Sequence, residues 1–136
     1  MRIVLDTNVL VSGLLTPHGP PGRLVDLLLA GEVTLIYDDR ILSEYHEVLE
    51  RPRFDFDPGD VEDVLELFAT EGEAVTAPPL AVELPDPDDL PFVEVATAGR
   101  ADALVTGNRR HFPARALPPG VRVVGVADFV REWSQR

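Results

Sequence analysis

Short apolar runs alternate with helical patterns along the whole chain, and this order limits the possible folds more than any other feature. Apolar runs short enough to be buried strands occupy residues 3–5, 33–37, 103–106 and 121–124, and a weaker strand is expected over 73–76. Strands that alternate with helices predict βαβ units. We therefore expect an α/β protein with a mainly parallel five-stranded sheet in a three-layer α/β/α arrangement.

Helical patterns and their end signals fill the intervals between these runs. The expected helices cover residues 8–15, the stretch from the prolines at 20 and 21 to Gly31, Asp38 to about Arg51, Pro58 to Gly72, 88–98 and 127–135. Residues 77–87 and most of 107–120 are rich in proline or glycine and are expected to be loops. A chain of 136 residues without an internal linker predicts one domain over 1–136.

Composition excludes several classes of site. The chain has no cysteine, which rules out disulfides, thiolate zinc sites and cysteine nucleophiles, and its three histidines are scattered. Asp6 and Asn8 interrupt the apolar N-terminal run, so it does not resemble a signal peptide. No apolar run approaches the ~20 residues of a membrane span. We expect a cytoplasmic protein that does not enter a membrane.

The charge is strongly negative and unevenly distributed. The net charge is −12, all twelve basic residues are arginine, and no basic residue lies between Arg53 and Arg100. A solvated acidic surface explains most of these charges. A nucleic-acid substrate would have to be met by a local group of arginines or through a bound cation, because the overall field repels it.

Polar side chains follow two of the predicted strands directly. Asp6, Thr7 and Asn8 come after the first strand, and Thr106, Gly107 and Asn108 lie at the end of the fourth strand and directly after it. Open parallel sheets bind ligands outside the carboxyl ends of their strands. A carboxylate buried there is costly unless it is paired or bound to a metal. Asp6 is therefore a candidate metal ligand, with capping of the next helix as the alternative role.

The helix expected from Asp38 offers one further carboxylate to this edge. On a helical wheel, Glu44 lies at the border of the apolar stripe, whereas Glu47 and Glu50 fall on the solvent side. Glu44 is thus the acid of this helix best placed to reach inward. Its alternative role is that of a boundary glutamate paired with an arginine.

The helix expected over 88–98 offers another carboxylate. Asp89 lies close to the centre of its buried face, and Glu94 is expected to point away. A capping role is the alternative for Asp89, since acidic residues favour helix N-termini.

Asp6, Glu44 and Asp89 are therefore predicted to converge on one rim of the sheet. Close carboxylates repel one another and raise each other's pKa, and a divalent cation removes this repulsion. Mg²⁺ prefers oxygen ligands of this kind. Such a site suits phosphodiester hydrolysis, in which the metal activates water and neutralises charge on the leaving oxygen.

The densest basic cluster of the chain follows Asn108. Arg109, Arg110 and His111 are expected beside the same rim, where they could position RNA phosphates. The alternative is that they are ordinary loop charges.

Three segments resemble the motifs of PIN-domain ribonucleases, in the same order and with similar spacing. Ile3–Leu10 resembles the opening of that family, Asp86–Ala96 its third acidic motif, and Ala101–Asn108 its fourth. The similarity is greatest to the VapC-like group, described as toxin components of bacterial toxin–antitoxin systems. It implies a PIN-like, Rossmann-like fold.

The resemblance also implies a function. It implies a Mg²⁺- or Mn²⁺-dependent endoribonuclease that forms a homodimer and is held inactive by a cognate antitoxin protein. Asp6, Glu44 and Asp89 would be its metal-site acids, and Asn8 would hold Asp6 by hydrogen bonding.

One position departs from the pattern of that family. Many relatives carry a fourth carboxylate shortly after the fourth strand, where this chain has Asn108. Asn108 is expected to take part in catalysis through its amide oxygen, but it adds no charge, so a second metal would bind weakly. This leaves open a catalytically weak or inactive PIN-like module that binds RNA or protein. A small-molecule phosphohydrolase is disfavoured, because such enzymes usually have a second acid where this chain has Asn8.

Overall fold

The computed structural model describes residues 1–136 and contains one five-stranded sheet. The strand order is β3-β2-β1-β4-β5, and every neighbouring pair is parallel. The strands are β1 (Arg2–Leu5), β2 (Thr34–Tyr37), β3 (Glu73–Ala74), β4 (Ala103–Thr106) and β5 (Val123–Gly125). The predicted α/β class and parallel sheet are confirmed.

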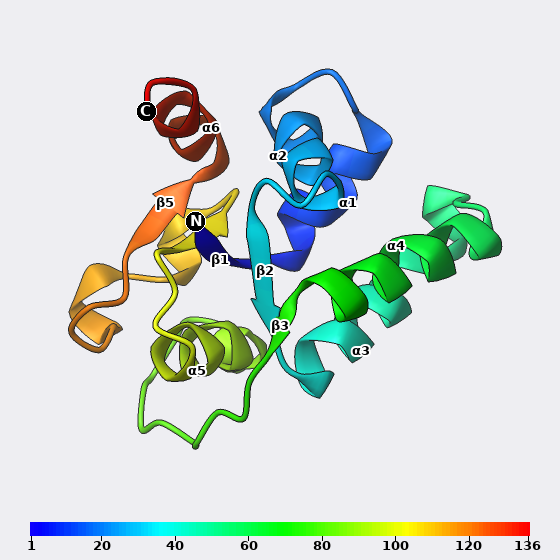
Figure 1. Ribbon diagram of the computed structural model, residues 1–136. Helices are drawn as coiled ribbons and strands as arrows, with labels where there is room; N and C mark the ends of the chain where they lie inside the picture. Colours follow the sequence, from blue (N-terminus) through cyan, green and yellow to red (C-terminus); the bar gives the residue numbers. More distant parts are fainter.

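Helices cover both faces of this sheet. They are α1 (Thr7–Leu15), α2 (Pro20–Leu29), α3 (Asp39–Leu49), α4 (Pro58–Glu71), α5 (Leu90–Ala98) and α6 (Val126–Ser134). Helices α1, α2 and α6 gather on one side and α5 lies on the other, while α3 and α4 pack together beside β2 and β3 (Figure 1). None of these helices combines the length and the apolar character needed to cross a membrane.

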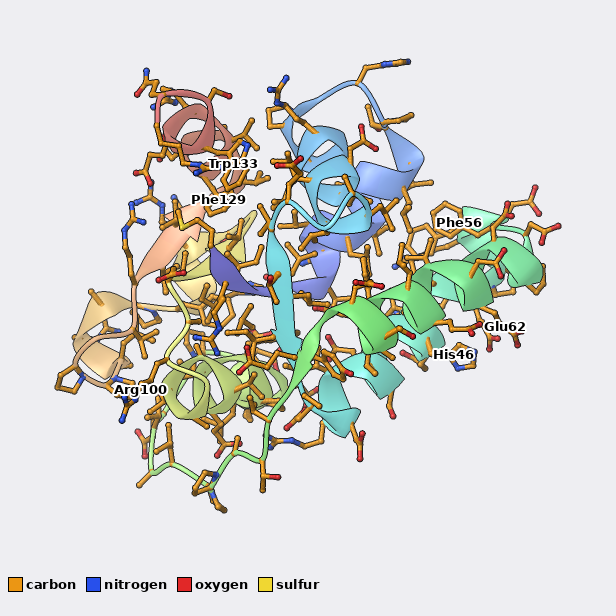
Figure 2. All side chains as sticks on the ribbon, in the orientation of Figure 1. His46, Phe56, Glu62, Arg100, Phe129 and Trp133 are labelled. Carbon is orange, nitrogen blue, oxygen red and sulfur yellow. The ribbon has the colours of Figure 1, made fainter.

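The central strands are buried on both faces, as a parallel sheet covered by helices requires. Ile3, Val4 and Leu5 of β1 have no exposed surface and belong to one core of 29 buried apolar residues. On α6, Phe129 is fully buried, and Trp133 packs against the same core on the side facing α2 (Figure 2).

Local signals explain where the two helices of the α3–α4 pair begin. The Asp38 carboxylate accepts a hydrogen bond from the Ile41 amide (3.1 Å), as expected of an N-cap. Asp57 caps α4 in the same way, and Pro58 occupies the first helical position.

Several expected boundaries are wrong by about two residues, and two of them have a clear physical reason. The helix expected from residue 88 begins at Leu90, because Pro87–Asp89 form a 3-10 turn that is closed by the Asp86 carboxylate. The last strand covers 123–125 instead of 121–124, because it starts where β4 offers a partner, with Leu104 opposite Val123.

The expectation that Glu94 points away from the protein is also wrong. Glu94 is only 3% exposed, and its carboxylate accepts hydrogen bonds from the Arg40 guanidinium and the Leu80 amide, both at 2.7 Å. The segment that contains Leu80 passes over this side of α5 and shields it from solvent. A helical wheel has no information about a covering segment from elsewhere in the chain. Glu94 thus ties α5 to the start of α3.

We expect Glu94→Ala to lower the free energy of unfolding by about 1–3 kcal/mol, because it leaves the Leu80 amide without its acceptor and Arg40 without its buried partner. Urea unfolding followed by circular dichroism measures this change. The matched control is Glu50→Ala, which removes an exposed glutamate paired with His46 and should change stability by less than about 0.5 kcal/mol. Equal losses in the two variants would contradict a structural role for the buried pair.

Candidate functional site

A cavity of about 410 Å³ opens where β1 ends, between α1, α3 and the turn that precedes α5. Its lining is dominated by polar and charged side chains. Five carboxylates contribute to it: Asp6, Glu44, Asp86, Asp88 and Asp89. The structure thus brings the three acids singled out in the sequence into one cavity, although they come from three separate elements.

Asp6 lies at the end of the central strand and is 3% exposed. Its backbone amide continues the ladder to β4 by donating to the Val105 carbonyl (3.0 Å), and its Oδ2 accepts a hydrogen bond from the Thr106 hydroxyl (2.8 Å). Asp6 occupies the N-cap position of α1, but its side chain makes no capping hydrogen bond. The carboxylate is therefore free to face the cavity.

The environment of Asp6 raises its pKa. Burial is the main cause, and it is opposed by the hydrogen bond from Thr106, by the nearby backbone amides of Asn8 and Thr7, and by the charge of His111. The side-chain hydrogen bond to the Asp6 carboxylate comes from the Thr106 hydroxyl, and the nearby amide of Asn8 also helps to lower the pKa of Asp6.

Glu44 reaches the cavity from α3 and is half-buried. It accepts a hydrogen bond from the Thr7 hydroxyl. Burial raises its pKa most, and the charges of Asp6, Asp88 and Glu47 raise it further.

The next residue, Tyr45, fixes the helix that carries Glu44. Its hydroxyl is fully buried and donates to the Leu5 carbonyl (2.6 Å) at the end of β1. Burial raises the pKa of Tyr45 well above its ordinary value, so the hydroxyl keeps the proton that it donates. Glu44 and Asp6 are thereby held beside the same strand end.

Asp89 ends the 3-10 turn Pro87–Asp89, and its side chain is 13% exposed. Its Oδ2 is buried and accepts no hydrogen bond, although His111 Nδ1 lies 3.3 Å away. Burial, followed by the charges of Asp6 and Asp86, raises the pKa of Asp89 to about 6, and the charge of His111 opposes this rise.

The donor set fits a hard divalent cation in its chemistry. Carboxylate oxygens are the ligands that Mg²⁺ prefers, and the buried Oδ2 of Asp89 is an acceptor without a hydrogen-bond donor. As the side chains stand, no three acidic or histidine residues are close enough together to share one ion. Glu44 is instead engaged with the Thr7 hydroxyl.

The residues after β4 divide into two groups. His111 lines the cavity, whereas Asn108, Arg109 and Arg110 do not. The Asn108 Oδ1 accepts a hydrogen bond from the Arg110 amide (3.1 Å) and closes the 3-10 turn Arg109–His111. The amide oxygen of Asn108 therefore has a local structural partner, and the catalytic role expected for it stays a prediction. Arg109 pairs with Asp128 on α6, 3.0 Å away.

Several residues of the cavity were missed in the sequence analysis. Arg51, Arg53 and Phe54 line the side where α3 ends, and Val48 lies between them and Glu44. Glu44, Val48 and Arg51 follow the i, i+4, i+7 spacing that defines one helix face. That spacing was the signal that could have linked the arginine to the acid.

Comparisons with known proteins agree with the fold. The family model of the PIN domain matches residues 2–110. The uncharacterized protein MJ1680 of Methanocaldococcus jannaschii is 26% identical over 112 residues, which cover 80% of this chain and 72% of that protein. The crystal structure of VapBC2 from Rickettsia felis, bound to a DNA fragment from its promoter, contains a chain of similar fold. That similarity has a TM-score of 0.59 at 18% identity and covers 92% of this chain and 98% of the other.

We expect Asp89→Asn to stabilise the metal-free protein near neutral pH. The pKa of Asp89 is about 6 in the folded protein against an ordinary value of 3.8, so ionisation of Asp89 removes stability as the pH rises through this interval. The variant should raise Tm by several degrees, at about 3 °C for each kcal/mol in a domain of this size, and should weaken the pH dependence between about 4 and 6.

Thermal unfolding with a chelator present measures both effects. Asp63→Asn, at an exposed position of α4 outside the cavity, is the matched control. A lower Tm for Asp89→Asn, or an unchanged pH dependence, would show that burial of this carboxylate does not oppose folding.

Proposed function

Because this chain belongs to the PIN-domain family, we propose that it is a metal-dependent endoribonuclease that hydrolyses RNA phosphodiester bonds. Asp6, Glu44 and Asp89 are the proposed ligands of Mg²⁺ or Mn²⁺. The observation that carries the proposal is the meeting of these three carboxylates in one cavity, each with a raised pKa. Perturbed acids that share a cleft are typical of functional sites.

The proposed roles follow from the surroundings of each acid. Asp6 is oriented by the Thr106 hydroxyl at the end of the central strand, and Glu44 by the attachment of Tyr45 to β1. The unpartnered oxygen of Asp89 is available to a cation, and His111 Nδ1 lies 3.3 Å from it within the same cavity. When bound, the cation supplies Lewis-acid chemistry, which neutralises charge on the phosphodiester and makes water a stronger acid.

Biologically, we propose that the chain acts as the toxin of a toxin–antitoxin pair. The support is the similarity of its fold to a chain in the VapBC2 structure, together with the family. The proposal includes a cognate antitoxin protein as partner and a homodimer as the assembled state.

A catalytically weak PIN-like module that binds RNA or protein is the second candidate. Two observations favour it: no three acidic or histidine side chains are close enough to share an ion, and Asn108 stands where many relatives have a fourth acid. Asp86 and Asp88 line the same cavity and offer further carboxylates, which keeps the nuclease as the leading candidate.

We expect the purified protein to cleave labelled RNA with Mg²⁺ or Mn²⁺ and to lose this activity in a chelator. Asp6→Asn, Glu44→Gln and Asp89→Asn should each slow cleavage by about 10²- to 10³-fold, because each removes charge that stabilises the transition state. A panel of structured and single-stranded RNAs resolved on gels provides the measurement.

The matched control is Glu50→Gln, on the solvent side of the helix that carries Glu44, and it should cleave like the wild type. Equal cleavage by the wild type and Asp6→Asn would overturn the catalytic assignment. A folded wild-type protein that neither cleaves RNA nor binds Mn²⁺ would support the binding module.

A further inference from the structure

The cavity has a basic edge opposite its acids. We define the arginine edge as Arg51, Arg53 and Phe54, which line the cavity where α3 ends. Arg51 and Arg53 are the only arginines of the chain in the cavity lining, and no basic residue follows them before Arg100. A polyanion that enters this cavity therefore finds its arginine contacts on this edge.

The backbone holds the arginine edge in one arrangement. Pro52 separates the two arginines, and the residues 52–54 form a 3-10 turn in which the Phe54 amide donates to the Arg51 carbonyl (3.1 Å). The next residue, Asp55, closes the turn in the left-handed region at a φ of 53°. Arg51 follows the end of α3 in an extended conformation, and it lines the same cavity as Glu44. The turn thus connects the edge directly to the helix that carries Glu44.

The side chains of the edge offer two kinds of contact. Arg51 is paired with Glu47 of α3 (3.0 Å), whereas Arg53 takes part in no ion pair. The guanidinium carbon of Arg53 lies 4.7 Å above the centre of the Phe54 ring. Phe54 is half-buried and stacks on Phe56, with ring centres 5.9 Å apart. Phe56 itself packs between α1 and the start of α4, outside the cavity (Figure 2). Phe56 therefore supports a ring that remains accessible from the cavity.

We propose that the arginine edge binds single-stranded RNA, with a phosphate on Arg53 and a neighbouring base stacked on Phe54. This inference rests on the proposed function and adds the form of the substrate to it. Guanidinium groups bind phosphate oxygens in a bidentate manner, and an aromatic ring binds only a base that has left its duplex stack. Arg53 replaces Arg109 as the proposed phosphate contact, because Arg53 lines the cavity without an ion-pair partner, whereas Arg109 lies outside the cavity lining and is paired with Asp128.

Fluorescence anisotropy of a short labelled poly(A) RNA tests the proposal in the Asp6→Asn background, which keeps the RNA intact. We expect Arg53→Gln to weaken binding about tenfold and to reduce the slope of log affinity against log salt by about 0.7. Phe54→Leu should also weaken binding about tenfold but leave the salt slope unchanged, because it removes stacking and no charge. Binding of the same RNA in a duplex should not respond to Phe54→Leu.

Two control variants distinguish contact at this edge from a general loss of positive charge and from a misfolded turn. Arg23→Gln removes an exposed arginine of α2 outside the cavity and should bind like the background. Phe56→Leu disturbs the packing beneath Phe54, and a loss equal to that of Phe54→Leu would assign the effect to the fold of the turn. Unchanged binding by both Arg53→Gln and Phe54→Leu overturns the proposal, as does a loss produced by Arg110→Gln alone.

Failure of RNA binding at the arginine edge can be distinguished from failure of the proposed ribonuclease activity. If the wild type cleaves no RNA but Arg53→Gln and Phe54→Leu lose binding, the edge is an RNA site on a non-catalytic module. If the wild type cleaves RNA but both variants bind normally, the nuclease stands and the edge does not hold its substrate. Equal binding of single-stranded and duplex RNA would also contradict the stacking contact at Phe54.

Discussion

Burial of the Asp6 carboxylate at the end of the central strand is the constraint on which the rest of the site depends. A carboxylate that is 3% exposed remains an anion only if other groups replace the water that it has lost. The Thr106 hydroxyl donates a hydrogen bond from the end of β4, and the nearby amides of Thr7 and Asn8 at the start of α1 also lower the pKa of Asp6. These groups meet Asp6 because β1 and β4 pair in parallel and end at the same edge.

The other two acids depend on contacts between elements that are distant in the sequence. Tyr45 attaches α3 to the end of β1, and this places Glu44 beside Thr7. Glu94 links α5 to the start of α3 through Arg40, one helical turn before Glu44. The site is therefore as rigid as the packing of α3 and α5 against the sheet.

Much of this could be predicted from the sequence where the signal is local. Apolar runs with clear boundaries predicted β1 and β4, and the helical wheel separated Glu44 from its acidic neighbours. The wheel failed for Glu94, because burial there comes from the segment that contains Leu80, which lies outside the helical pattern of α5. The sequence also did not reveal that the amide oxygen of Asn108 accepts a hydrogen bond from the Arg110 amide within the same turn. Asparagine side chains often make such local hydrogen bonds to the backbone.

The strongly acidic surface makes any RNA binding depend on the few positive groups of the arginine edge. With a net charge of −12, the molecule repels RNA at long range, so affinity has to come from the few positive groups that face the cavity. In the proposed function, a cation held by the carboxylates and Arg53 would both face the same cavity. An RNA strand that contacts both would reach from the acids to Arg53, and contact with only one of them would gain little against the surrounding repulsion.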